Sequence, residues 1–277
     1  MTKKNRLNNI FGKKGGVIIG AIHFPPLLGY PDFPGFEMAL KNAINDLRAL
    51  EKGGVDGIIF ENNYDIPHSP KVSQETVACM LYLGSKLREM TKLPMGVDVL
   101  WNDYRVALSI AKILNLQFIR IPVFVDKVKT DCGIIRGNPK DVVGFRKNIG
   151  ADNVAIFTDI HVKHSKLLSR HNIISSAKLA IKNHSDGLIL TGNWTGQAPD
   201  MEELKTVRRA VGDFPILIGS GTDAKNVRAL FEYANGAIVS TSLKEGTTRK
   251  GEVNVKGYGQ RISHKKTESL VRASSKR

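Results

Sequence analysis

Eight short apolar runs, separated mostly by amphipathic segments, constrain the fold of this 277-residue chain more than any other feature. Strands that alternate with helices form βαβ units, and these build a parallel sheet. Eight such units in about 250 residues match a (β/α)8 TIM barrel, so we predict this α/β fold. An open doubly wound sheet is the alternative. The runs begin near Val17, Gly57, Met95, Phe118, Val154, Gly187, Pro215 and Ala237.

The segments between these runs carry the periodicity of helices. In residues 36–52, Leu40, Leu47 and Leu50 fall on one helical face. Ser73 suits the start of a helix in residues 73–91, and Asp200 suits the start of another in residues 200–211. We also predict helices over residues 139–148 and 172–183, and one that begins near Asp223.

Composition favours one large domain in a reducing compartment. The hydrophobic fraction of 42% is sufficient for a full core. Cys79 and Cys132 show neither metal-ligand spacing nor a disulfide framework. Apolar runs of the roughly 18 residues that a membrane span needs are absent, and the start lacks the apolar core of a signal peptide. We therefore expect a cytoplasmic protein.

Positive charge is concentrated at the two ends of the chain. Residues 1–15 carry +5 and residues 256–277 carry +6, which leaves +4 of the total +15 for the body. We divide the chain into a basic N-terminal extension (1–15), a barrel (16–256) and a basic C-terminal tail (257–277). We expect solvated, flexible ends, and their charge also allows peripheral contact with an anionic membrane. Nucleic-acid binding is not expected, because the ends lack interleaved aromatic residues.

The stretch from Asn153 to His164 indicates a buried strand that becomes ionisable at its C-terminal end. Alternate residues of a strand point to the same side, which places Asp159, His161 and Lys163 together. A parallel sheet normally buries both sides, so these groups need polar partners or a ligand. His164 has the opposite parity and is expected to face a helix or solvent.

Other strands show the same habit of ending in polar residues. The C-terminal rim of a TIM barrel is where active sites lie, so these residues predict a polar site there. The alternative is a buried structural network in which Arg120 bridges Glu61 and Asp98. The polar residues that fall late in the other strands and face the predicted interior are His23, Glu61, Asp98, Asn102, Arg120, Thr191 and Asn193.

Two chemistries fit this rim. Glu61, Asp159 and His161 could hold a divalent metal ion that polarises an oxygen or a water. Alternatively, a carboxylate and an imidazole serve as general acid and base, with Asp159 and His161 as the leading pair and His23 and Glu61 assisting. The early GxGxxG fingerprint is absent after the first strand, so no nucleotide cofactor is expected.

Three further residues complete the predicted catalytic set. Asp98 and Arg120 would orient the reacting groups. Lys163 could stabilise developing negative charge, or form a Schiff base if burial lowers its pKa.

A phosphate-binding corner is predicted from the last two strands. Gly219, Ser220, Gly221 and Thr222 follow the seventh run, and Ser240-Thr241-Ser242 closes the eighth. Glycines permit close backbone approach and hydroxyls donate hydrogen bonds, and the loops after strands 7 and 8 of this fold often bind phosphate. An ordinary tight turn is the alternative reading of Gly-Ser-Gly. Trp194, in a glycine-rich loop after the sixth strand, could stack on a sugar or a base.

Motifs spread in order over residues 16–256 resemble the BtpA/SgcQ family. The chain departs from the usual pattern at Asp98, where Asn is common in the family; the extra carboxylate would favour cation binding or strengthen the pairing with Arg120. The segments that carry the resemblance are Ile22–Pro31, Gly53–Asn62, Gly96–Asp103, Phe118–Ile121, Thr130–Gly133, Asp159–His164, Gly219–Gly221 and Gly236–Lys244.

This resemblance implies a TIM barrel related to ribulose-phosphate-binding barrels, without a settled reaction. One family name comes from a cyanobacterial factor for photosystem I biogenesis, and another branch is similar to a sugar-metabolism component. We predict an enzyme, by hydrolase, lyase or isomerase chemistry, for a small phosphorylated sugar- or nucleoside-like metabolite. The alternative is a non-catalytic biogenesis factor for a membrane complex. We also expect a homo-oligomer.

Overall fold

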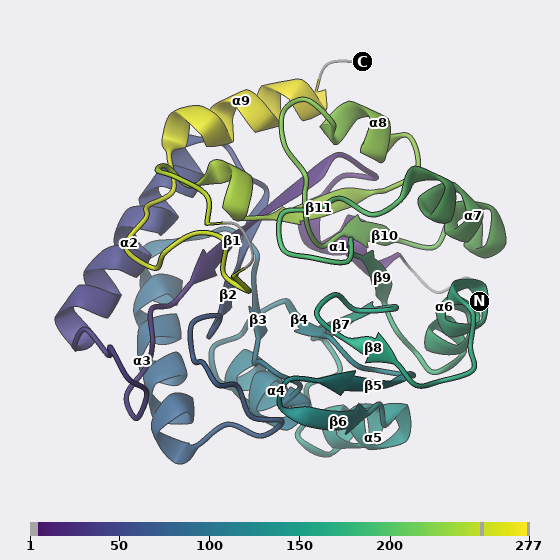
Figure 1. Cartoon of the computed structure of the whole chain (residues 1–277), viewed down its shortest axis with the longest axis horizontal. Coiled ribbons are helices and arrows are strands. Elements are labelled where there is room, and N and C mark those ends of the chain that lie inside the picture. Colours follow the sequence, from purple (N-terminus) through teal and green to yellow (C-terminus); the bar gives the residue numbers. More distant parts are fainter. Residues whose placement is uncertain (1–4, 250–251, 276–277) are drawn as a thin grey trace.

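The computed structural model describes residues 5–249 and 252–275. Within them, eight parallel strands close into a barrel that helices surround (Figure 1). The predicted TIM barrel is confirmed, with strands at the eight predicted apolar runs. In chain order the barrel strands are β1 (Val17–His23), β2 (Gly57–Glu61), β3 (Met95–Asp98), β4 (Phe118–Ile121), β7 (Ala155–Asp159), β9 (Gly187–Leu190), β10 (Ile216–Ile218) and β11 (Gly236–Val239).

The outer helices begin where capping residues stand. Ser73 Oγ accepts a hydrogen bond from the Thr76 amide at the start of α3, and the Asp200 carboxylate caps α7. The last predicted helix starts later than expected, because Asp223 holds a turn over the next three residues. The helices around the barrel are α2 (Phe36–Lys52), α3 (Gln74–Met90), α4 (Tyr104–Ile113), α5 (Pro139–Asn148), α6 (Ile173–Lys182), α7 (Met201–Val211) and α8 (Val227–Phe231).

Alternation along the strands sorts side chains as predicted. Ile19, Phe118 and Phe157 belong to a small apolar cluster inside the barrel, and the opposite faces of the strands join the larger cluster beneath the helices. The parallel register then sets the polar ends side by side, because His23 pairs with Glu61 and Glu61 pairs with Asp98. The barrel interior therefore changes from apolar to ionisable along its axis.

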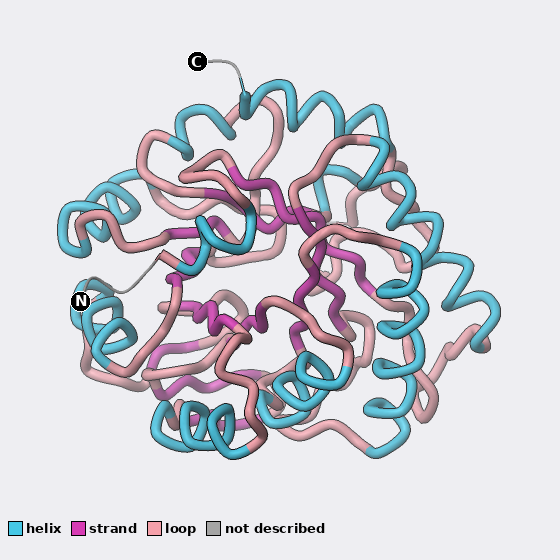
Figure 2. Tube along the Cα trace, turned by 180° about the vertical axis from the view of Figure 1, so that it is seen from behind, coloured by secondary structure: helices cyan, strands magenta, loops and turns pink. Residues whose placement is uncertain are grey.

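The expectation of flexible ends is wrong for the described parts of both ends. Helix α1 (Arg6–Phe11) closes the N-terminal end of the barrel, with Leu7 fully buried and the Phe11 ring 5.9 Å from that of Phe118. Seen from behind in Figure 2, α1 lies across the strands. Helix α9 (His264–Ser275) packs along α2 and α8 and buries Leu270 (Figure 1). Apolar residues among the basic ones allow both helices to dock.

A small antiparallel sheet is a second departure from the sequence prediction. It pairs β5 (Lys127–Thr130) with β6 (Gly133–Arg136) and with β8 (Lys166–Leu167), where a polar loop was expected. Val128 and Ile135 pack against Trp101 beneath it. The loops that follow β4 and β7 supply the strands of this sheet, which lies at one side of the C-terminal rim. None of the helices in the described ranges is long and apolar enough to cross a membrane.

Candidate active site

Four ionisable side chains from four barrel strands meet at the C-terminal end of the interior. Arg120 Nε and Nη2 each donate to an Asp159 carboxylate oxygen at 2.8 Å. Arg120 Nη1 lies 3.5 Å from Glu61 Oε1, and its Nε lies 3.7 Å from Asp98 Oδ2. All four residues are buried. The bidentate pair holds the guanidinium in place, as expected for arginine and a carboxylate.

His23 lies on the other side of Glu61, with Nε2 3.5 Å from Oε2. Burial, with the positive charges of Lys244, Lys163 and Arg120, holds the pKa of His23 well below its usual range. The imidazole is therefore neutral at pH 7, with one ring nitrogen that donates and one that accepts. Glu61 is thus positioned between a neutral imidazole and a guanidinium.

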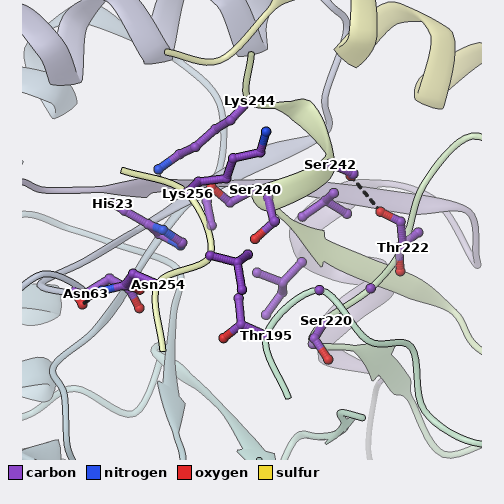
Figure 3. Close-up of a pocket in the computed structure, with 18 of the residues that line it drawn as sticks. His23, Asn63, Thr195, Ser220, Thr222, Ser240, Ser242, Lys244, Asn254 and Lys256 are labelled. Atoms are coloured by element: carbon purple, nitrogen blue, oxygen red, sulfur yellow. Dashed lines mark hydrogen bonds between the residues drawn. The ribbon is translucent and has the colours of Figure 1, made fainter. Parts of the chain in front are cut away.

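A cavity of about 600 Å³ opens above this cluster (Figure 3). It brings the predicted phosphate corner and part of the predicted catalytic set into one space. In Figure 3, Ser240 lies between His23 and Thr222. The predicted site residues that line this cavity are His23, Glu61, Arg120, Lys163, Gly219, Ser220, Gly221, Thr222, Ser240, Thr241 and Ser242.

The hydroxyls of the phosphate corner divide into two groups. Ser220 Oγ donates to the Gln197 carbonyl, and Ser242 Oγ donates to the Thr222 carbonyl, each at 2.7 Å. Thr222 Oγ1 and Ser240 Oγ are buried without a hydrogen-bond partner among the described residues. Since buried hydroxyls are normally paired, these two are free to meet a ligand.

The glycines of this corner serve the loop packing as well. Gly221 has a φ of +69°, and a Cβ there would collide with the backbone of Gln197 and Ala198. Only glycine lets the loop after β9 pass so close to the loop after β10. The Gly-Ser-Gly motif thereby holds Ser220 and Thr222 at the edge of the cavity.

Three lysines of the cavity were not among the predicted site residues. Lys244 is 1% exposed, and its Nζ donates to Tyr64 Oη at 3.1 Å. Burial is the main cause that lowers the pKa of Lys244 to about 8. Lys256 and Lys266 line the same cavity. The one signal in the sequence was the position of Lys244, two residues after Ser242 at the end of the last strand motif.

The predicted pairing of Asp159 with His161 is not what the structure shows. Strand β7 ends at Asp159, and His161 takes a left-handed φ of 52°, so alternation stops there. His161 Nε2 lies 3.4 Å from Ser176 Oγ on α6, whereas Asp159 faces Arg120. Lys163 does line the cavity, and burial is the main cause that lowers its pKa to about 8.

The proposed metal ligands Glu61, Asp159 and His161 are not gathered into one cluster. Across residues 5–249 and 252–275, no group of three or more His, Cys, Asp or Glu side chains is arranged to hold a metal ion. Both carboxylate oxygens of Asp159 already accept from Arg120. Burial raises the pKa of Asp98 well above its usual range, which favours a neutral carboxyl. Metal binding stays a prediction.

Three residues that were predicted to bind ligand do not line this cavity. The Asn102 amide exchanges two hydrogen bonds with the Val123 backbone, and Thr191 Oγ1 accepts from the Lys163 amide. Neither residue lines the cavity above the ion cluster. Asn193 lines a neighbouring cavity instead.

The fold and this site define the chain as a (β/α)8 barrel with a polar cavity at its C-terminal end, rich in hydroxyls and lysines. The family model described as BtpA family matches residues 14–265. A protein from Synechocystis sp. named Photosystem I biogenesis protein BtpA is 36% identical over 240 residues, which cover 86% of this chain and 82% of that protein. The chain belongs to the BtpA family.

Solved structures support the same architecture at low sequence identity. Tryptophan synthase from M. tuberculosis superposes with a TM-score of 0.59 at 14% identity, over 98% of each chain. N-(5'-phosphoribosyl)anthranilate isomerase from Pyrococcus furiosus gives a TM-score of 0.53 at 14% identity, over 93% of this chain and 98% of that one. At these identities the likeness shows the fold alone.

Proposed function

We propose that this protein is an enzyme that acts on a small phosphorylated metabolite, sugar- or nucleoside-like, by acid/base chemistry at the C-terminal end of its barrel. The observation that carries the proposal is one cavity shared by two unpaired hydroxyls, a set of lysines and an ionisable cluster. A site of this kind at this end of a TIM barrel is typical of an enzyme.

The phosphate would bind between the loops after β10 and β11. Thr222 Oγ1 and Ser240 Oγ are the free donors, and Lys244 supplies a nearby positive charge. The Lys244 ammonium has three N–H donors and makes one hydrogen bond, to Tyr64, among those to described residues. Two solved structures of similar fold, N-(5'-phosphoribosyl)anthranilate isomerase and fructose 1,6-bisphosphate aldolase, have phosphorylated compounds in their names.

The reacting part of the substrate would then lie over Glu61 and Lys163. Glu61 can accept a proton, and its partner Arg120 is held by Asp159 so that the carboxylate stays in place. With a pKa of about 8, Lys163 is in part a neutral amine near pH 7, able to accept a proton or to attack a carbonyl carbon. His23, neutral beside Glu61, can relay a proton.

Thermal-shift measurements with a library of phosphorylated sugars and nucleosides, with and without divalent cations, test this proposal. We expect at least one compound to raise the melting temperature of the wild type, and Ser240→Asp to abolish the shift through charge repulsion with phosphate. The matched control is Ser175→Asp, an exposed serine in the first turn of α6 outside the cavity. Absence of any stabilising phosphorylated compound would contradict the proposal.

A second candidate is an assembly factor for a membrane complex, which the name of the Synechocystis relative favours. Lys265 and Arg272 are exposed on α9 and would meet an anionic surface. Because α9 packs on the barrel, charge reversal tests this better than deletion. Vesicles that contain anionic lipid should sediment the wild type at low salt and release a Lys265→Glu/Arg272→Glu variant. Failure of the wild type to sediment would count against this candidate.

A further inference from the structure

A second cavity, of about 680 Å³, opens beside the first. The two cavities share five lining residues, which are Glu61, Asn63, Arg120, Lys163 and Thr195. A ligand with its phosphate in the first cavity can therefore cross the shared residues and enter the second. We call the second cavity the aromatic chamber, after the residues that line it.

Two tryptophans, Trp101 and Trp194, and three histidines, His68, His161 and His164, line the aromatic chamber. Trp101 is 7% exposed and packs on the apolar cluster beneath the small antiparallel sheet. Trp194 meets the His164 ring edge-to-face, with ring centroids 4.3 Å apart, and its Nε1 donates to the Glu252 carbonyl at 3.2 Å. The side chains are thus fixed as flat walls, which suit the face of a planar ring.

Unpaired hydrogen-bonding atoms are also present in this chamber. His68 Nε2 and His164 Nδ1 are buried and have no hydrogen-bond partner within residues 5–249 and 252–275. Burial is the main cause that lowers the pKa of both imidazoles, that of His164 to about 4, so both rings are neutral at pH 7. A neutral imidazole nitrogen donates or accepts one hydrogen bond, which matches the edge of a ring that carries nitrogen and oxygen atoms.

The charged side chains that belong to the chamber alone do not suggest a second phosphate. Apart from the shared residues Glu61, Arg120 and Lys163, its charged lining residues are Lys129, Lys166 and Asp131, and all three are exposed. Exposed charges of mixed sign are screened by water and bind a phosphate weakly. Beyond the shared residues, two tryptophans, three histidines and apolar side chains such as Leu100 and Val162 line the chamber, in contrast to the hydroxyl- and lysine-rich first cavity.

We propose that the aromatic chamber binds a planar heteroaromatic ring, so that the substrate is a phosphorylated pentose joined to such a ring, as in nucleotides. This inference rests on the proposed function, because the phosphate corner fixes the other end of the molecule. The bond between ring and sugar then lies over Glu61 and Lys163, two of the five residues that both cavities share. The same two residues were assigned the proton transfers, so the reaction takes place at or next to that bond.

Calorimetric titration tests the inference with four probes: ribose 5-phosphate, adenosine 5'-monophosphate, uridine 5'-monophosphate and nicotinamide mononucleotide. We expect at least one ring-bearing probe to bind about tenfold or more tightly than ribose 5-phosphate, the scale of one stacking contact with an aromatic side chain. Trp194→Ala should remove this advantage and leave the affinity for ribose 5-phosphate unchanged. Trp194→Phe should keep most of it, and Tyr82→Ala, an exposed aromatic on α3, should keep all of it.

The outcomes distinguish a failure of the ring-binding inference from a failure of the proposed phosphate site. If ribose 5-phosphate binds and no ring-bearing probe binds more tightly, the aromatic chamber has another role and the phosphate site stands. An advantage that survives Trp194→Ala also overturns the inference, because the ring then lies elsewhere. If none of the four probes binds, both the inference and the phosphate site are overturned.

Discussion

Phe118 and Arg120 stand two residues apart on the same inward face of β4 and show how the two ends of the barrel differ. The Phe118 ring lies 5.3 Å from that of Phe157 and 5.9 Å from that of Phe11, in an apolar layer closed by α1. Arg120 meets the carboxyl groups of Glu61, Asp98 and Asp159 under an open cavity. Burial of apolar groups stabilises the first end, whereas burial of charges costs free energy at the second. A protein is expected to retain such buried charges where it binds a ligand or catalyses a reaction.

The largest effect is expected at the polar end. Arg120→Met leaves the buried carboxylates of Glu61 and Asp159 without their counter-charge, so the free energy of unfolding should fall by about 3–5 kcal/mol and binding of phosphorylated ligands should be lost. Urea denaturation and calorimetric titration measure the two effects. The double variant Arg120→Met/Asp159→Leu should recover most of the stability but none of the binding. If the double variant is as unstable as Arg120→Met, unpaired charge does not explain the loss of stability.

Phe118→Ala probes the apolar end on the same strand. Loss of a fully buried phenyl ring should cost about 3–4 kcal/mol through a cavity between Phe11 and Phe157. Ligand affinity, measured at a temperature where the variant stays folded, should match the wild type. A marked loss of affinity would show that the two ends are not independent.

Leu7→Ala tests whether α1 is part of the barrel core. Leu7 is fully buried, so we expect a loss of about 2–3 kcal/mol in denaturation. An exposed substitution, Glu89→Gln on α3, serves as the reference and should change stability by less than about 0.5 kcal/mol. A Leu7→Ala variant as stable as the reference would mean that α1 contributes little to closing the barrel.

Lys163→Met should change the free energy of unfolding by a smaller amount, and in the opposite direction. The folded-state pKa of about 8 lies below the ordinary value near 10.4, so at pH 7 the folded state carries a charge that burial disfavours. The variant should therefore be more stable by about 1 kcal/mol at pH 7, a modest figure because water still reaches the side chain.

The pH dependence gives this prediction its control. Between pH 8 and 10 the folded wild type releases the proton while the unfolded chain still holds it, so wild-type stability rises with pH. The advantage of the variant should shrink over that range and vanish above it. An advantage that stays constant with pH would point to packing instead of charge.

Much of the fold followed from local patterns, because apolar runs and amphipathic segments are set by residues close in sequence. The inward faces were predictable for the same reason, as Phe118 and Arg120 illustrate. The docking of α1 and α9 was missed because two or three apolar side chains, such as Leu7 and Leu270, were outweighed by surrounding positive charge. The antiparallel sheet was missed because Lys127–Thr130 alternates over only four residues.

The candidate site was only partly predictable. Alternation predicted that His23 and Glu61 face inward late in their strands, and the register of the structure sets them side by side. The phosphate corner was predicted from glycines and hydroxyls at the ends of the last two strands. Alternation was extended beyond Asp159, where the strand ends, so His161 was misplaced. Of the aromatic chamber, only Trp194 was suggested by the sequence as a stacking residue. Trp101, His68 and His164 come from separate loops, and local patterns do not show that these loops meet.

The position of the phosphorus atom in a crystal structure with a bound phosphorylated ligand is the most direct measurement of the central claim. Phosphate oxygens within hydrogen-bonding distance of Thr222 Oγ1 and Ser240 Oγ are the predicted result. A ligand ordered with its phosphate in the aromatic chamber, or at the end of the barrel closed by α1, would contradict it.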